Sequence, residues 1–287
     1  MERTKERSSF RKKFIGDRKF YMMVLAVAVP IMIQNGITNF VSLLDNIMIG
    51  RIGTEQMSGA SIVNQLIFVY NLAIFGAASA ASIFGAQYFG KGNHEGHMYS
   101  FRFKLYATMF VTILAITLFI TNGENLISLY LTDTAGTGAT DVALRYGKQY
   151  LSIMLIGLVP FAVTQSYATN IKETGQTFVP MAASFVAVGS NAVLDYLLIF
   201  GIGPFPKLGV MGAALATILA RYIEAAIIVI WAHSHKEKNK YLAGAYRGFG
   251  MPMGEFKAIL IKGFPLMLNE LLWAARMTAV TQCYSVR

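Results

Sequence analysis

Long apolar segments separated by shorter polar connectors account for most of the chain. A helix needs about 20 apolar residues to cross the hydrocarbon core of a bilayer, and these segments approach or exceed that length. The pattern predicts an all-α integral membrane protein with longer connectors near residues 85–104, 122–140 and 234–253. The expected transmembrane helices lie at about residues 20–49, 55–82, 103–121, 144–168, 178–201, 208–232 and 257–285.

Polar residues recur on one face of the first predicted helix. Four of them step by four, four and three residues, which is the spacing of a single helical face. The set is Gln34, Asn35, Thr38, Asn39, Ser42, Asp45 and Asn46. Helix packing through buried amides is common in membranes, but a carboxylate within so broad a polar face favours the lining of a cavity. We expect Gln34, Thr38, Asn39 and Ser42 to line it.

Two aspartates lie deep within apolar segments, Asp45 in the first helix and Asp195 in the fifth. Asn191 precedes Asp195 by one helical turn, so both share a face with Ser184. A carboxylate inside the hydrocarbon region costs several kcal/mol unless it lines a polar cavity, and it therefore indicates an ion or substrate path. If the two helices meet, the carboxylates form a like-charge pair that would hold a proton or a monovalent cation.

Other proline, polar and charged positions have less certain roles, and two of them, Pro30 and Thr217, have two interpretations each. Pro30 favours a bend in the first helix, which would be a functional hinge or a static kink. The hydroxyl of Thr217 could ligate a cation or bond to its own helix. Arg221 and Glu224 are three residues apart, which predicts a local ion pair. Arg276 in the last helix has no evident partner in the sequence.

Composition and charge narrow the function. Of the 287 residues, 55% are hydrophobic and 14% are charged, against about 25% charged in a soluble domain. Eight Lys or Arg residues precede the first helix, and 18 lie on its side of the membrane against four on the other. This asymmetry predicts a cytoplasmic N-terminus in the cell membrane and needs no nucleic-acid partner to explain the charge of +10. With one cysteine and no catalytic signature, neither a cofactor nor enzymatic activity is expected.

The last predicted helix resembles the first. FYMMVLAVAVP followed by IMIQN, and FKAILIKGFP followed by LMLNE, both place an amide four residues after a proline. Six helices followed by a copy of the first suggest a fragment of a 6+6 repeat. The expected organisation is a basic tail at 1–19, a six-helix lobe at 20–233, a cytoplasmic loop at 234–256 and the seventh helix at 257–287.

The order of three motifs resembles the N-terminal half of multidrug and toxic compound extrusion (MATE) transporters. They are VPIMIQNGITNFVSLLDNIMIGRIG in the first helix, GAQYFGKGN after the second and SNAVLDYLLIFG in the fifth. The resemblance implies twelve helices in two lobes, and export of cationic amphiphilic compounds driven by inward H⁺ or Na⁺ flow. The implied partners are such a substrate, membrane lipid and the missing second lobe.

The resemblance also implies roles for individual residues. Asp45 matches the acid of the first helix, and Asn191 with Asp195 matches the amide and acid of the fifth. Tyr150 and Thr217 fall near further residues of the same cation site. If Na⁺ is the coupling ion, Asp45, Asn191 and Asp195 would be its ligands. Glu270 lies closer to its proline than the coupling glutamate of some family branches and is not assigned that role.

Three other functions stay open from the sequence. A lipid-linked saccharide flippase of related architecture should have a cationic cavity, which Asp45 and Asp195 argue against and Arg276 favours. A membrane-embedded enzyme of lipid metabolism would need an acidic metal cluster at a membrane face. A non-transporting membrane scaffold would be indifferent to neutralisation of either aspartate.

Overall fold

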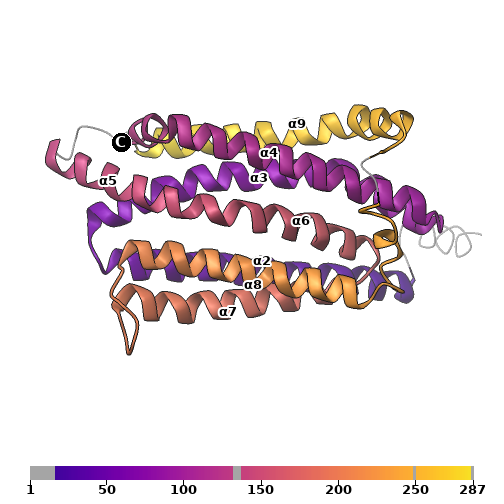
Figure 1. Cartoon of the computed structure of the whole chain (residues 1–287), viewed down its shortest axis with the longest axis horizontal. Coiled ribbons are helices and arrows are strands. Elements are labelled where there is room, and N and C mark those ends of the chain that lie inside the picture. Colours follow the sequence, from indigo (N-terminus) through magenta and orange to yellow (C-terminus); the bar gives the residue numbers. More distant parts are fainter. Residues whose placement is uncertain (1–16, 132–136, 248–249, 286–287) are drawn as a thin grey trace, which may run out of the picture.

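The computed structural model describes residues 17–131, 137–247 and 250–285. Its α-helices run along a shared direction and pack side by side (Figure 1). They are α2 (Arg18–Gly50), α3 (Thr54–Gly90), α4 (His94–Ser128), α5 (Thr137–Met154), α6 (Leu158–Glu173), α7 (Phe178–Phe200), α8 (Val210–Ser234) and α9 (Met253–Ser285). Two short 3-10 helices, η2 (Leu155–Gly157) and η3 (Lys240–Leu242), lie in the same described part of the chain, which has no strand.

Six helical segments are long and apolar enough to cross a membrane, by length and composition. At a rise of about 1.5 Å per residue, each can span a hydrocarbon core of about 30 Å. The predicted class, an all-α protein built of membrane-spanning helices, is confirmed. The segments are Arg18–Ile37, Thr54–Gly90, His94–Ser128, Ala139–Glu173, Phe178–Phe200 and Val210–Ser234.

Two connectors are shorter than the sequence pattern predicts. Helix α3 continues to Gly90, so residues 85–90 are helical although we expected a loop there. Helix α4 begins at His94, because the side chain of Asn93 accepts a hydrogen bond of 2.9 Å from the backbone N–H of Gly96 and so caps it. Helix α4 likewise continues to Ser128, into the predicted connector. The hydropathy pattern alone does not locate the caps of these helices.

The predicted helix at 144–168 is two α-helices joined by η2. Pro160 has no backbone N–H and its ring excludes the normal hydrogen bond of the preceding turn, so the chain tightens into a 3-10 turn at Leu155–Gly157. Pro160 then lies in the first turn of α6, where an N–H is not needed. The segment therefore remains one membrane span, Ala139–Glu173, with a 3-10 turn inside it.

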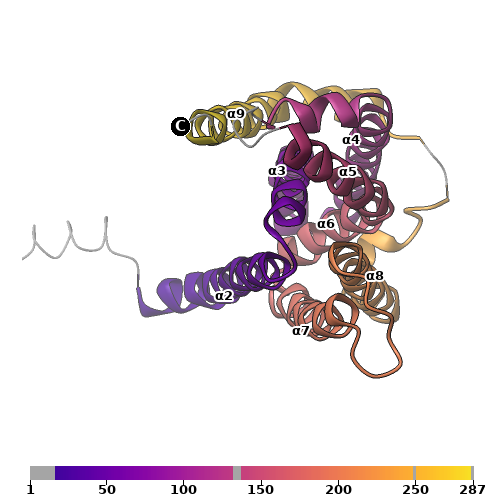
Figure 2. The ribbon, with the colours of Figure 1, turned by 90° about the vertical axis from the view of Figure 1, so that its left-hand side faces the viewer.

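The helices divide into two groups in an end-on view (Figure 2). Helices α2 and α8 both contact α7, whereas α3 contacts α4, α5 and α9. Helix α6 joins the groups through contacts with α3, α4 and α8. Small residues allow the close contacts: a Cβ added at Gly212 would lie 2.6 Å from the carbonyl oxygen of Leu198 on α7.

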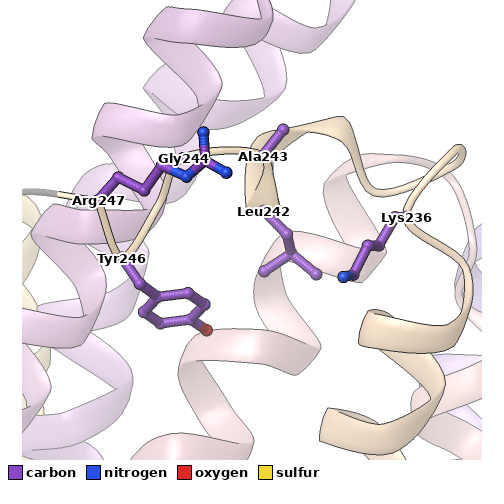
Figure 3. A pocket seen from close by; sticks show the side chains of 6 residues that line it. All are labelled: Lys236, Leu242, Ala243, Gly244, Tyr246 and Arg247. Carbon is purple, nitrogen blue, oxygen red and sulfur yellow. The ribbon is translucent and has the colours of Figure 1, made fainter.

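The connector between α8 and α9 is held against α4 by Arg102. Its guanidinium donates to the carbonyl oxygens of Ala245 at 2.9 Å, Gly250 at 2.6 Å and Gly244 at 2.7 Å. Beside these residues is an open pocket of about 570 Å³, and Figure 3 shows the side chains that line it. Because three backbone carbonyls bond to one buried cation, Arg102 anchors Gly244, Ala245 and Gly250 to the lobe.

Candidate cation site

The aspartates of α2 and α7 face each other. Helix α2 packs along α7, and the carboxyl groups of Asp45 and Asp195 lie close enough to interact with one another. Asp195 has an exposed fraction of 0%, and Asp45 is partly buried. Residues 150 positions apart in the sequence thus form one acidic pair inside a bundle of apolar helices.

Three of the four carboxylate oxygens of this pair lack a hydrogen-bond donor among the described residues. Both carboxylate oxygens of Asp195 and Oδ1 of Asp45 are buried without a hydrogen-bond partner. Ionised carboxylates only accept hydrogen bonds, so two of them facing each other leave the space between them without a donor. A shared proton, or a cation bound between the oxygens, would satisfy both.

Asn191 lies beside the acidic pair. Its amide neighbours Asp195 on the next turn of α7, and its exposed fraction is 6%. The Nδ2 atom of Asn191 is buried and has no hydrogen-bond partner among the described residues. Two carboxylates and an amide provide the oxygen ligands that suit a proton or a small hard cation.

Tyr150 of α5 lies near the pair. It is 3% exposed, and its hydroxyl donates a hydrogen bond of 3.2 Å to Oδ1 of Asn64 on α3. Tyr150 also lies near enough to both aspartates for electrostatic interaction. The sequence did not single out Asn64, although Asn64 and Asn71 are seven residues apart on one face of α3, a spacing that could have identified it.

The remaining predicted site residues have different positions. Thr217 is partly buried on α8 and, within the described part of the chain, makes no hydrogen bond to either aspartate. Asn39 is exposed. Pro30 lies inside α2, which continues as one helix from Arg18 to Gly50. The side chains of Thr38, Ser42 and Glu270 lie outside the described residues, and Arg276 is exposed on α9.

The predicted ion pair between Arg221 and Glu224 is wrong. Arg221 donates instead to the carbonyl oxygen of Gly157 at 3.2 Å, and its guanidinium lies 5.0 Å from the ring centroid of Phe161. Glu224 accepts a hydrogen bond from Ser184 on α7. The tertiary contacts with η2, α6 and α7 outcompete the local pair, which is worth only a few tenths of a kcal/mol on a helix surface.

Ser184 connects Glu224 to Gln34. The Nε2 atom of Gln34 on α2 donates to the hydroxyl oxygen of Ser184 at 2.6 Å, and that hydroxyl donates to Oε1 of Glu224. Three helices therefore contribute one side chain each to a continuous hydrogen-bonded chain. The sequence indicated Gln34 and Ser184 as polar residues on the faces of α2 and α7 but did not indicate this link.

A second buried charge cluster joins α4 to α6. Lys104 is 0% exposed, and its ammonium group donates to Glu173 and, at 2.5 Å, to Oδ1 of Asn170. His97 Nε2 lies 3.3 Å from the other carboxylate oxygen of Glu173. The sequence pattern did not indicate this cluster, because Lys104 lies at the end of the predicted connector 85–104, where a charge is expected to be solvated.

The sequence is similar to those of known membrane transporters. The sequence model of the MatE family matches residues 30–197. A probable multidrug resistance protein NorM from Thermotoga maritima is 25% identical over 264 residues, which cover 88% of this chain and 52% of that protein. An FAD transporter from Shewanella oneidensis is 27% identical over 183 residues, 62% of this chain and 38% of that protein. The chain spans about half the length of the NorM relative and less of the FAD transporter.

In the solved structures of similar fold, this chain likewise covers about half of each protein. A MATE transporter in a bent conformation superposes with a TM-score of 0.74 at 21% identity, over 89% of this chain and 54% of that one. A MOP superfamily transporter from Pyrococcus furiosus gives the same TM-score, identity and coverages. The predicted fold, a lobe plus one helix that together make up about half of such a transporter, is confirmed.

Proposed function

Because the chain belongs to the MatE family, we propose that it forms the N-terminal lobe and seventh helix of a multidrug exporter driven by inward flow of H⁺ or Na⁺. The observation that carries this proposal is the pair of Asp45 and Asp195 between membrane helices, where three carboxylate oxygens have no donor among the residues that the structure describes. Such a pair needs a cation, which is what a coupling site must bind and release.

The proposed cycle begins with a cation that enters from outside and binds between the two carboxylates. Binding removes the repulsion between α2 and α7, and α2 shifts or bends near Pro30 so that the substrate cavity contracts. Release of the cation inside the cell restores the repulsion. Each charge that crosses the membrane provides about 2.3 kcal/mol per 100 mV, which supports a substrate gradient of about forty-fold.

The packing of α2 supports this role for it. It contacts α7 closely, α3 and α8 less, and much of its length is exposed in this lobe. A helix held mainly along one side can move against its neighbour at a lower cost than one enclosed by the bundle. The exposed side of α2, which includes Asn39, is available to line a substrate cavity shared with the second lobe.

The proposed substrates are cationic amphiphiles, and the proposed location is the cell membrane with a cytoplasmic N-terminus. An acidic lobe interior attracts a cation and repels an anion. The FAD transporter among the relatives, and the flippase reading based on Arg276, both suggest an anionic substrate instead. An assay that compares a cationic with an anionic substrate therefore distinguishes a cation exporter from a transporter of anions.

The test is efflux from vesicles that contain the full-length protein. A fluorescent organic cation and FAD are loaded separately, and the pH and Na⁺ gradients are imposed one at a time. We expect the cation to be exported under one gradient by the wild type, and Asp45→Asn to abolish the gradient dependence. Asp141→Asn, which neutralises an exposed acid on α5, is the matched control and should transport like the wild type.

Equal export by the wild type and Asp45→Asn under every gradient would contradict the coupling proposal. Export of FAD without export of the cation would contradict the proposed substrate class and leave the coupling site intact. Loss of transport in Asp141→Asn as well would show that the assay reports folding, in which case the melting temperature of each variant separates the two effects.

A further inference from the structure

Glu224 is an acid within an apolar membrane helix that the proposed coupling pair does not use. It lies on α8, is partly buried, and accepts a hydrogen bond from Ser184 on the neighbouring helix. Ser184 in turn accepts from Gln34 on α2. An ionisable residue in a membrane helix is costly and requires a partner or a function.

In the part of the chain that the structure describes, no cation neutralises Glu224 by direct contact. Arg221, one turn away, is bonded to the carbonyl oxygen of Gly157 and stacked over Phe161. Lys172 of α6 interacts with Glu224 electrostatically but forms no ion pair with it among the described residues. One hydroxyl donor satisfies part of a carboxylate, which can accept about four hydrogen bonds. The site has capacity for a proton or a cation.

Polar side chains connect Glu224 to the coupling pair. Ser184, Asn191 and Asp195 lie on one face of α7, and Gln34 and Asp45 are three turns apart on one face of α2. These eleven residues on α2 correspond to about 16 Å along the helix. Between the two ends lies Asn191, whose Nδ2 is buried and unpartnered.

We propose that Glu224, Ser184 and Gln34 form a second station for the coupling cation, between the Asp45–Asp195 pair and the cytoplasm. The proposal rests on the proposed function and extends it, because it specifies the route by which the cation leaves. Gln34 is nearer than Asp45 to the N-terminal end of α2, so a cytoplasmic N-terminus makes this station the exit. The carboxylate receives the cation from the pair, and the Ser184 hydroxyl and Gln34 amide orient it.

Glu224→Gln is the sharpest test, because the glutamine oxygen still accepts the Ser184 hydrogen bond while the charge is lost. In vesicles of the full-length protein, with the exported dye and the effective gradient, we expect efflux to fall about tenfold, equivalent to about 1.4 kcal/mol. The remaining efflux should no longer respond to the concentration of the coupling cation on the cytoplasmic side. Glu224→Asp should restore both properties in part.

The control is Glu237→Gln, which neutralises an exposed acid just beyond α8 and should behave like the wild type. Efflux by Glu224→Gln with the wild-type rate and the wild-type cation response, in a preparation where Asp45→Asn is inactive, would overturn the second station. If Asp45→Asn is active as well, the coupling proposal itself fails.

If Glu224→Gln does not fold, Ser184→Ala is tested instead. This variant keeps the charge of Glu224 and removes the hydroxyl that links Gln34 to Glu224. We expect this variant to export more slowly than the wild type and to respond to cytoplasmic cation at a different concentration. A correctly folded Ser184→Ala with wild-type rate and response would overturn the proposal.

Discussion

Two buried charge clusters in this lobe differ in whether their charges compensate one another. Lys104 and Glu173 join α4 to α6 as opposite charges, and Asn170 accepts a further hydrogen bond from the same ammonium group. Asp45 and Asp195 join α2 to α7 as like charges, and three of their four carboxylate oxygens are buried without a donor among the described residues, whereas in Glu173 only Oε2 is. A pair of opposite charges holds two helices together, whereas two acids with no cation between them need one from outside the protein. The first cluster therefore suits a structural role and the second a transport role.

The largest expected effect comes from breaking the opposite-charge cluster. Lys104→Met leaves Glu173 buried without its cation and should lower the free energy of unfolding by about 3–5 kcal/mol. Thermal unfolding of the detergent-purified protein measures this loss. Adding Glu173→Gln to the same variant removes the uncompensated charge and should recover much of it. A Lys104→Met protein as stable as the wild type would contradict the structural role.

A smaller effect is expected from crowding the same cluster without changing a charge. A Cβ added at Gly85 of α3 would lie 2.0 Å from Oε2 of Glu173, so Gly85→Ala must displace that carboxylate. Overpacking of this kind costs about 1–3 kcal/mol. Gly189 on α7, two residues before Asn191, has nothing within 4 Å of an added Cβ and is the matched control.

We expect Gly85→Ala to melt below the wild type and Gly189→Ala to melt at or above it, since replacing glycine within a helix is favourable where space permits. Equal melting temperatures would mean that the close approach of α3 to Glu173 contributes nothing to stability.

The smallest effect on stability is expected at the acidic pair. Asp195→Asn replaces a like-charge contact with an amide that can donate to Asp45, which should raise stability by about 0.5–1.5 kcal/mol. Transport driven by the cation gradient should nevertheless be lost. The measurements are the melting temperature and the vesicle efflux assay on the same preparation. A strongly destabilised Asp195→Asn would mean that the acidic pair stabilises the fold as the Lys104–Glu173 cluster does, which would contradict the proposed difference in role.

The sequence predicted the elements of the fold well and the contacts among them unevenly. The apolar segments located the membrane helices, and the buried acids with Asn191 indicated the chemistry of the site. The extensions of α3 and α4 were missed, because a cap such as Asn93 acts through a hydrogen bond from the backbone to its side chain, which hydropathy does not record. The break at η2 was missed although Pro160 was visible in the sequence.

The chain itself determined which segments are helical and which residues carry charge into the membrane, because both depend on local composition and on the period of the α-helix. Tertiary structure alone decided the partners of those charges. Gln34, Ser184 and Glu224 are separated by 150 and 40 residues, and Arg221 bonds to Gly157 rather than to Glu224 one turn away. Pairing between helices depends on how their faces meet, since a buried polar group takes the best-placed partner in space, which is often not the nearest in sequence.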